Sequence, residues 1–147
     1  MRIKNEIEYV IRILLYLTKY GQDRIISSNE ISEAEEIPHL FSLRILKKLE
    51  KAGLVNIYKG ARGGYQLTKP SEEITLRDAI ETIEPIISIK DCVNDPGSCS
   101  LRRGECAVHR AFNEIQMDFI KKLEARNFKE LAEETYKDCN CGCNTTK

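Results

Sequence analysis

The chain has 147 residues, with 23 Lys and Arg against 23 Asp and Glu and a formal net charge of +0. No apolar run approaches the roughly 20 residues of a membrane span, and the N-terminus has no signal-peptide apolar region. We therefore expect a cytoplasmic protein with one good core, or with a small core plus an appendage, and with no membrane partner. No nucleophile–base motif and no phosphate-binding loop occurs, which argues against an enzyme.

Charge is unevenly distributed along the chain. Residues 1–70 hold 12 Lys and Arg against 8 Asp and Glu, whereas residues 71–147 hold 11 against 15. Residues 38–62 carry six basic side chains and one acidic side chain. Because binding responds to the local field, the N-terminal half is a candidate for nucleic-acid binding despite the neutral total.

Three helices are predicted at the start of the chain. Apolar residues at helical spacing predict a helix over 3–20 that ends at Gly21. Ser27 with Glu30 fits the capping box of a short second helix, and Pro38 suits the first turn of a third helix over 38–52. The 3.6-residue period assigns an inner face to Phe41, Ile45, Leu46 and Leu49, and an outer face to Leu40, Leu43, Arg44, Lys47 and Lys51.

A basic hairpin follows the three helices. Strand-like runs at 54–58 and 65–67 flank the tip Lys59-Gly60-Ala61-Arg62-Gly63-Gly64. The predicted fold class is therefore mainly α with a small β wing, a winged helix-turn-helix domain followed by a long dimerisation helix. The third helix would read the major groove and the wing would meet a minor groove or phosphates, although a solvated basic face and an ordinary hairpin are the simpler alternatives. The predicted DNA-binding residues are Leu40, Ser42, Leu43, Arg44, Lys47, Lys48, Lys59 and Arg62.

Helical patterns return in the second half of the chain. Thr75 with Asp78 fits the cap of a fourth helix, and Asn127 with Glu130 fits that of a short last helix. Between them lies a long helix, which we expect to form a homodimer because a helix after a compact domain has little in its own chain to pack against. Its dimerisation stripe is Val108, Phe112, Ile115, Phe119 and Leu123. The predicted units are 1–84 (DNA binding), 85–107 (cysteine segment), 108–134 (dimerisation helix and the short helix) and 135–147 (flexible tail).

Three evenly spaced cysteines precede the long helix. Six residues separate Cys92 from Cys99 and Cys99 from Cys106, and two residues separate Cys106 from His109. Thiolates and an imidazole in a polar, turn-rich segment suit an iron–sulfur cluster, which tolerates irregular spacing. Zinc usually has tighter cysteine pairs, and a disulfide switch needs only two thiols. His109 could instead be a surface residue of the helix.

Two further features could carry metal or redox chemistry. Glu8 could reach a metal site from a partner subunit, although a solvated carboxylate is the simpler interpretation. Cys139, Cys141 and Cys143 could capture soft metals or exchange disulfides, although a tail without a fixed role is the default.

The motifs together resemble the IscR/NsrR-type family of winged-helix transcriptional regulators over about residues 1–134. The resemblance rests on MRIKNEIEYVIRILLYL, on LKKLEKAGLVNIYKGARGGYQL, on ITLRDAIETIE and on the three-cysteine segment leading into a long helix. It implies a homodimeric transcription factor, acting on double-stranded promoter DNA, whose three cysteines ligate iron. The fourth ligand would be a histidine, matched by His109, or an acidic residue of the partner's first helix, matched by Glu8.

The resemblance leads us to expect a repressor that senses iron–sulfur status, redox state or nitric oxide. The Cys106-x-x-His109 unit favours a [2Fe–2S] cluster, with [4Fe–4S] as the alternative. Two departures are that the cysteine intervals are one residue longer than in the family and that Leu43 stands where an acidic reader can occur. The other candidate functions are a winged-helix regulator with a thiol switch, zinc or a small-molecule effector, and a redox or metal protein that does not bind DNA.

Overall fold

The first helix lies at the centre of the fold. In the computed structural model, which describes residues 4–84, 87–99 and 106–137, α1 spans Asn5–Tyr20. Its apolar stripe is fully buried at Ile13, Leu14 and Leu17. The helix ends where the Gly21 N–H donates to the Leu17 carbonyl at 2.9 Å. The helix predicted over 3–20 is thus confirmed over Asn5–Tyr20, while Lys4 precedes it in an extended conformation.

Helices α2 (Ser28–Ala34) and α3 (His39–Lys51) form the helix-turn-helix. Ser27 caps α2, because its side chain accepts from the Glu30 N–H at 3.2 Å. The buried face of α3 consists of Ser42, Ile45, Leu46 and Leu49. These residues have the i, i+3, i+4, i+7 spacing of one helix face. Placing Phe41 on this face was wrong: its side chain is 44% exposed.

The predicted wing is an antiparallel hairpin of β1 (Val55–Tyr58) and β2 (Gly64–Leu67). Gly60 has φ 108°, a conformation that favours glycine. A Cβ at Gly63 would lie 2.1 Å from the Tyr58 carbonyl oxygen, so this turn also needs glycine. On its other side β2 pairs with Ile26 through reciprocal bonds with Tyr65 of 3.0 and 2.8 Å. The wing is therefore attached to the segment between α1 and α2.

The C-terminal helix returns to this body. After η1 (Ser71–Glu73), α4 (Leu76–Glu81) begins with the complete capping box of Thr75 and Asp78. The residues before α7 (Phe128–Lys137) pair with the segment before α4, since the Phe128 N–H donates to the Ile74 carbonyl at 2.8 Å. Phe128 is fully buried in the same core as α1 and α3.

The functions assigned to the four predicted units remain predictions. The hydrophobic core, however, crosses the boundaries between these units. Residues 108–134 include Phe128, which packs into the core of residues 1–84. Helix α7 also extends to Lys137, past the predicted tail boundary at 135. The tail cysteines at 139, 141 and 143 lie outside the described residues.

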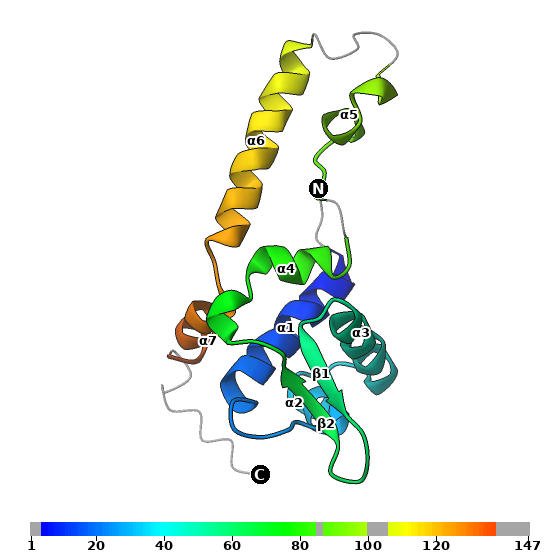
Figure 1. The fold of residues 1–147 in the computed structure, drawn as a ribbon, viewed down its shortest axis with the longest axis vertical. Helices are drawn as coiled ribbons and strands as arrows, with labels where there is room; N and C mark the ends of the chain where they lie inside the picture. The colour runs from blue at the N-terminus through cyan, green and yellow to red at the C-terminus, as the bar shows by residue number, and fades with distance from the viewer. Residues whose placement is uncertain (1–3, 85–86, 100–105, 138–147) are drawn as a thin grey trace.

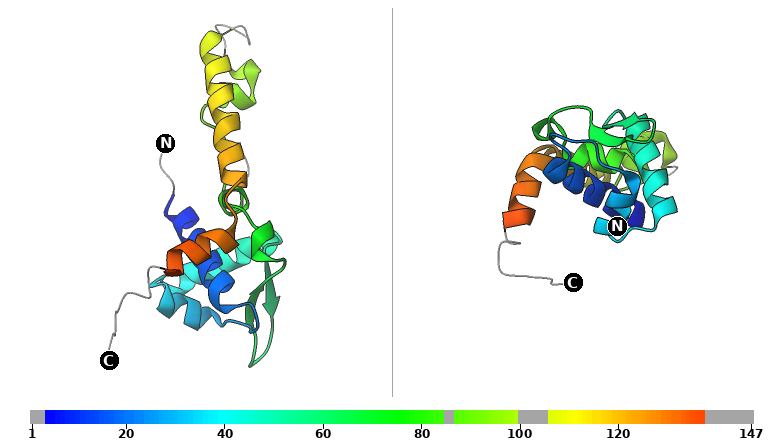
Figure 2. Two further views of the ribbon diagram at one scale, coloured as in Figure 1. Left: turned by 90° about the vertical axis from the view of Figure 1, so that its left-hand side faces the viewer. Right: turned by 90° about the horizontal axis from the view of Figure 1, so that it is seen from below.

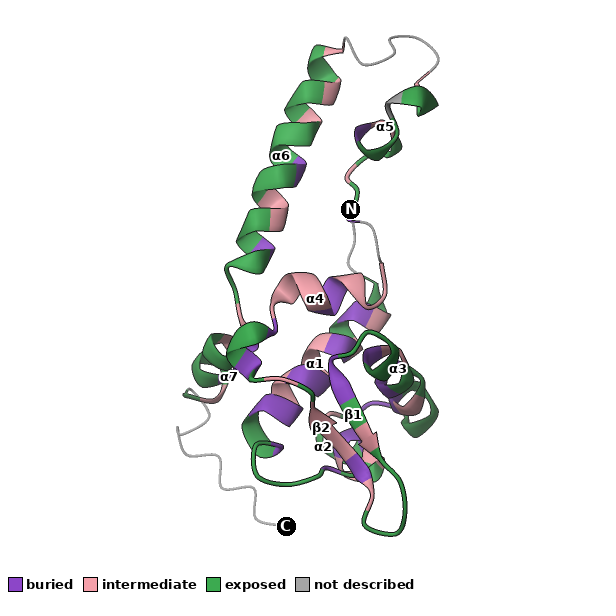
Figure 3. Ribbon diagram, viewed as in Figure 1, coloured by how far each residue is buried: buried purple, intermediate pink, exposed green. Residues whose placement is uncertain are grey.

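An arm extends from the body. It consists of α5 (Asp91–Asn94), η2 (Pro96–Ser98) and α6 (Ala107–Glu124). Figures 1 and 2 show α6 rising away from the body with α5 beside it. Most of α6 is exposed, and its buried positions lie toward α5 or the body (Figure 3). No helix among the described residues is long and apolar enough to span a membrane.

Candidate nucleic-acid interface and cysteine segment

The outer face of α3 presents apolar and cationic side chains together. Leu40 is 80% exposed, and Arg44 and Lys47 are exposed beside it. The Arg44 guanidinium lies 5.3 Å from the centre of the Phe41 ring, within cation–π range. Phe41 in turn packs against Tyr9 of α1, with ring centroids 6.4 Å apart. Sequence reasoning missed this stack, although the spacing of Ser42, Ile45 and Leu49 already moves Phe41 to the edge of the inner face.

Two predicted DNA-binding residues have other roles in this structure. The Ser42 side chain is fully buried and bonds to the Ser32 hydroxyl at 2.7 Å and the His39 carbonyl at 3.0 Å. Ser42 links α3 to α2. Because its side chain lies on the buried face of α3, it is not available for DNA contact. Lys48 is half-exposed and lies 2.9 Å from Glu6 of α1, so its charge is compensated within the chain.

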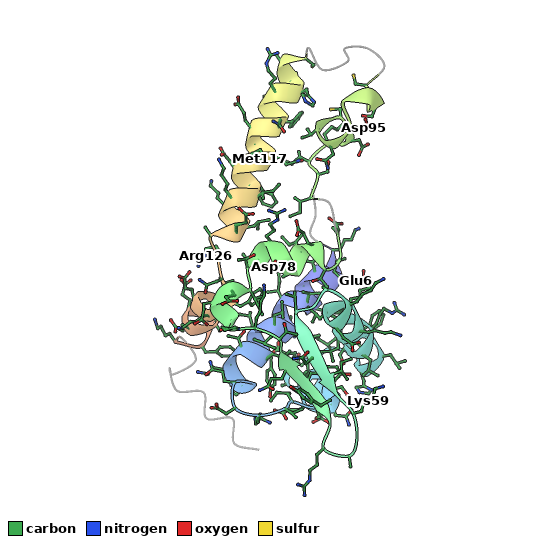
Figure 4. The ribbon with its side chains drawn as sticks, in the orientation of Figure 1. Glu6, Lys59, Asp78, Asp95, Met117 and Arg126 are labelled. Carbon is green, nitrogen blue, oxygen red and sulfur yellow. The ribbon has the colours of Figure 1, made fainter. Side chains whose placement is uncertain are left out.

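The wing carries its cations at an exposed tip. Lys59 and Arg62 are both exposed. Figure 4 shows Lys59 at the hairpin, at the opposite end of the molecule from Asp95 on the arm. Helix α3 packs against β1, and Figure 1 shows α3 beside the hairpin that forms the wing. The arrangement suits a helix in a major groove with a hairpin beside it.

The three cysteines each lie at or beside an end of a helical element on the arm. Cys92 is in the first turn of α5, Cys99 follows η2, and Cys106 immediately precedes α6. All three are half-buried, and Cys92 and Cys99 carry free thiols. His109 is half-buried and lies one turn into α6 from Cys106. The sequence therefore places every donor of the predicted set on the arm.

The chemistry of this donor set fits an iron–sulfur cluster, since three thiolates and an imidazole are ligands that such clusters accept. The described residues do not yet assemble these donors: nowhere in 4–84, 87–99 and 106–137 do three His, Cys, Asp or Glu side chains converge as a metal ion requires. Cys92, Cys99, Cys106 and His109 thus all lie on the arm without being gathered around one point.

Glu8 lies on α1 and not on the arm. Its side chain is 61% exposed and its carboxylate is 3.6 Å from Arg12, which also forms an ion pair with Glu35 at the end of α2. Within one chain Glu8 is an exposed member of this network. The alternative fourth-ligand role therefore requires Glu8 of one subunit to contact the cysteines of its partner subunit.

The predicted dimerisation stripe divides into two parts. Val108 and Ile115 are 59% and 55% exposed. Phe119 and Leu123 pack instead on a cluster that includes Ile7 and Ile80 of the body. The expectation that α6 has little of its own chain to pack against was wrong for this lower part, because α4 and the start of α1 lie beneath it.

The fold and its basic face define the chain as a winged-helix DNA-binding protein. A family model described as "Rrf2: Iron-dependent Transcriptional regulator" matches residues 3–134. The chain belongs to the Rrf2 family, whose members are transcriptional regulators and not enzymes. A non-DNA-binding redox protein is therefore no longer a candidate. A relative from Aquifex aeolicus (strain VF5), named "Putative HTH-type transcriptional regulator", is 29% identical over 132 residues, 89% of this chain and 91% of that protein.

Solved structures share the fold over most of the chain. CymR, the global cysteine regulator of B. subtilis, superposes with a TM-score of 0.76 and 24% identity, covering 91% of this chain and 98% of CymR. IscR of T. potens gives a TM-score of 0.76 at 17% identity, covering 97% and 93%. The oxidised form of Staphylococcus aureus CymR gives 0.69 at 26% identity, covering 90% and 97%. These likenesses establish the winged-helix architecture with its long helix.

Proposed function

We propose that this Rrf2-family regulator is a homodimeric repressor that binds promoter DNA. Its DNA affinity would depend on an iron–sulfur cluster held by Cys92, Cys99 and Cys106. The observation that carries the proposal is the position of the three cysteines. They lie at the ends of α5, η2 and α6, in the stretch of sequence that connects the DNA-binding body to the long helix. A group bound there would order the arm and influence the angle of α6.

The energy required for such control is small. A tenfold change in operator affinity corresponds to about 1.4 kcal/mol. Fixing the backbone of a single residue costs roughly 1–2 kcal/mol, so ordering a short segment is enough. Because each α6 would contact its partner in the dimer, a change in its angle would alter the separation of the two α3 helices.

For DNA contact we assign Leu40, Leu43, Arg44 and Lys47 to the major groove. Leucine side chains can meet thymine methyl groups, while Arg and Lys can read guanine or neutralise phosphates. Lys59 and Arg62 of the wing would hold the flanking minor groove. Two such bodies would read half-sites about one helical turn apart.

For the cluster we assign three thiolates and the His109 imidazole as ligands, with [2Fe–2S] as the favoured type and [4Fe–4S] as the alternative. Glu8 of a partner subunit is the alternative fourth ligand. A bound cluster would supply chemistry that is sensitive to iron supply, oxidants and nitric oxide. The chain's own contribution is to hold these donors on an arm whose position bears on DNA binding.

The test is an anaerobic absorption spectrum of freshly purified protein with iron and sulfide assays, followed by gel shifts on promoter DNA. Cys92→Ala should remove the visible absorption and change DNA affinity by about tenfold. The matched variant Arg62→Ala should keep the colour and weaken DNA binding. Protein that stays colourless after anaerobic reconstitution, or a Cys92→Ala variant with the DNA affinity of cluster-bound wild type, would overturn cluster sensing.

A thiol switch is the second candidate. Cys92 and Cys99 carry part-exposed free thiols, and one structural neighbour, Staphylococcus aureus CymR, was solved in an oxidised form. Under this alternative, mild oxidant would join two cysteines, remove two hydrogens and change DNA affinity in iron-free protein. Intact-mass measurement with gel shifts separates the two mechanisms. Zinc would give metal without visible absorption, and a small-molecule effector would act with neither metal nor oxidation.

A further inference from the structure

A buried amide fastens the cysteine segment to the long helix. Gln116 of α6 is only 5% exposed. Its Oε1 accepts a hydrogen bond from the Ile89 backbone N–H at 2.9 Å, and its Nε2 donates to the Asn94 Oδ1 at 3.0 Å. These partners lie three residues before and two residues after Cys92. Both polar ends of one side chain therefore bind the segment that carries this cysteine.

The position of Gln116 on α6 is otherwise apolar. It shares a face with Phe112, Phe119 and Leu123, at the i, i+4, i+7, i+11 spacing that follows one side of a helix. A buried amide is tolerated at such a position only when its hydrogen bonds are made. An apolar side chain would pack with several registers of α5, whereas the amide keeps both its accepted and its donated hydrogen bond in the register in which Ile89 and Asn94 face it.

Few other contacts fix α5. Its one buried side chain is Val93, and α5 contacts α6 at few positions. No ion pair recorded for the described residues joins α5 to α6. Among the residues that the structure describes, the two hydrogen bonds of Gln116 thus provide the directional link between the Cys92 segment and α6.

We infer that Gln116 is a positioning residue that sets the register of the cysteine segment on α6 and transmits a change of state at Cys92 to the long helix. This inference rests on the proposed function for its DNA readout, but the clamp itself does not. When Cys92 binds a metal or forms a disulfide, α5 must move with it, and Gln116 either carries α6 along or releases it.

The first test measures the clamp without metal or DNA. In reduced protein, Gln116→Met keeps the side-chain length and removes both hydrogen bonds. Alkylation of Cys92, followed by peptide mass mapping, and amide hydrogen exchange at Ile89 should both become about tenfold faster. Asn94→Asp keeps the acceptor for Nε2 and should stay within about twofold of wild type. The control Met117→Gln changes an exposed neighbour and should leave both rates unchanged.

The second test measures transmission. Gel shifts compare each variant in two states, cluster-bound against cluster-free or oxidised against reduced. Gln116→Met should keep the affinity of the ligand-free, reduced protein within about twofold of wild type while the ratio between states falls toward one. Asn94→Asp should retain the ratio. A purely structural role would lower both affinities together and leave the ratio intact.

The outcomes separate the inference from the proposed function. Unchanged alkylation and exchange rates in Gln116→Met would overturn the clamp, and faster rates with an unchanged ratio between states would overturn transmission. A wild-type protein whose DNA affinity is the same in all states would instead refute regulation through the cysteines. In that case the alkylation and hydrogen-exchange rates of the first test would alone decide whether the clamp exists.

Discussion

The DNA-binding body and the arm are built in different ways. Helix α3 buries four of its 13 residues, and three of them are apolar side chains in a core to which α1 and α7 also contribute. Helix α6 buries only two of its 18 residues, and one of them is an amide. The body therefore fixes α3, to which we assign the major-groove contacts, with its own apolar side chains. The arm depends on a few directional contacts, which suits an element whose position is set by a bound group or a partner subunit.

Core substitutions should show the contrast most strongly. Leu46→Ala in α3 removes a fully buried side chain and should lower the free energy of unfolding by about 2–5 kcal/mol. Ile115→Ala on the exposed side of α6 should change it by no more than about 0.5 kcal/mol at concentrations where the protein is monomeric. Urea unfolding measures both. Equal losses would mean that the arm is as tightly packed as the body.

The reading face should respond in DNA affinity and not in stability. Arg44→Ala should weaken specific binding by about 1–3 kcal/mol and reduce the dependence of affinity on salt. Titrations at several salt concentrations provide the measurement. Lys121→Ala, which removes an exposed cation from α6, is the matched control and should have little effect. A comparable loss in the control would mean that binding follows total charge and not the α3 face.

The exposed side of α6 should govern self-association. Ile115→Asp places a charge on the surface that we assign to the dimer and should weaken association at least tenfold, or about 1.4 kcal/mol. Met117→Asp places the same charge on the far side of the helix and should be nearly neutral. Sedimentation velocity distinguishes the two. If Met117→Asp alone dissociates the protein, the interface lies on the other side of α6.

We expect the smallest effect on the free energy of unfolding from alkaline pH, which acts through Tyr16 of α1. Burial, followed by the hydrogen bond that the Tyr16 hydroxyl donates to Glu30, raises the pKa of Tyr16 to about 12 from its usual value near 10. The folded state thus retains the Tyr16 proton to a higher pH than the unfolded state does. The stabilisation that comes from this protonated hydroxyl is complete below pH 10 and is lost as the pH rises toward 12. Tyr16→Phe should lose less free energy of unfolding than wild type between pH 10 and 12. An identical pH dependence would contradict the burial of this phenol.

Local chemistry was readable from the sequence where it depends on nearby residues. The cap at Ser27 and the complete capping box at Thr75 and Asp78 follow from side chains that bond to backbone groups three residues away. The hairpin followed from glycines at positions that exclude a Cβ. The helical period predicted α1 and the presence of a long helix after the cysteines, and the motifs over residues 1–134 indicated the family that the comparisons establish.

Contacts between distant segments were decided by tertiary structure alone. Phe128 enters the core because the segment before α7 pairs with Ile74, more than fifty residues earlier in the chain. Ser42 forms a hydrogen bond between α3 and α2, and Gln116 binds the Cys92 segment. The sequence spacing within each helix does not specify these hydrogen-bond partners. Periodicity shows which side of a helix is apolar, but only the packed chain determines what that side touches.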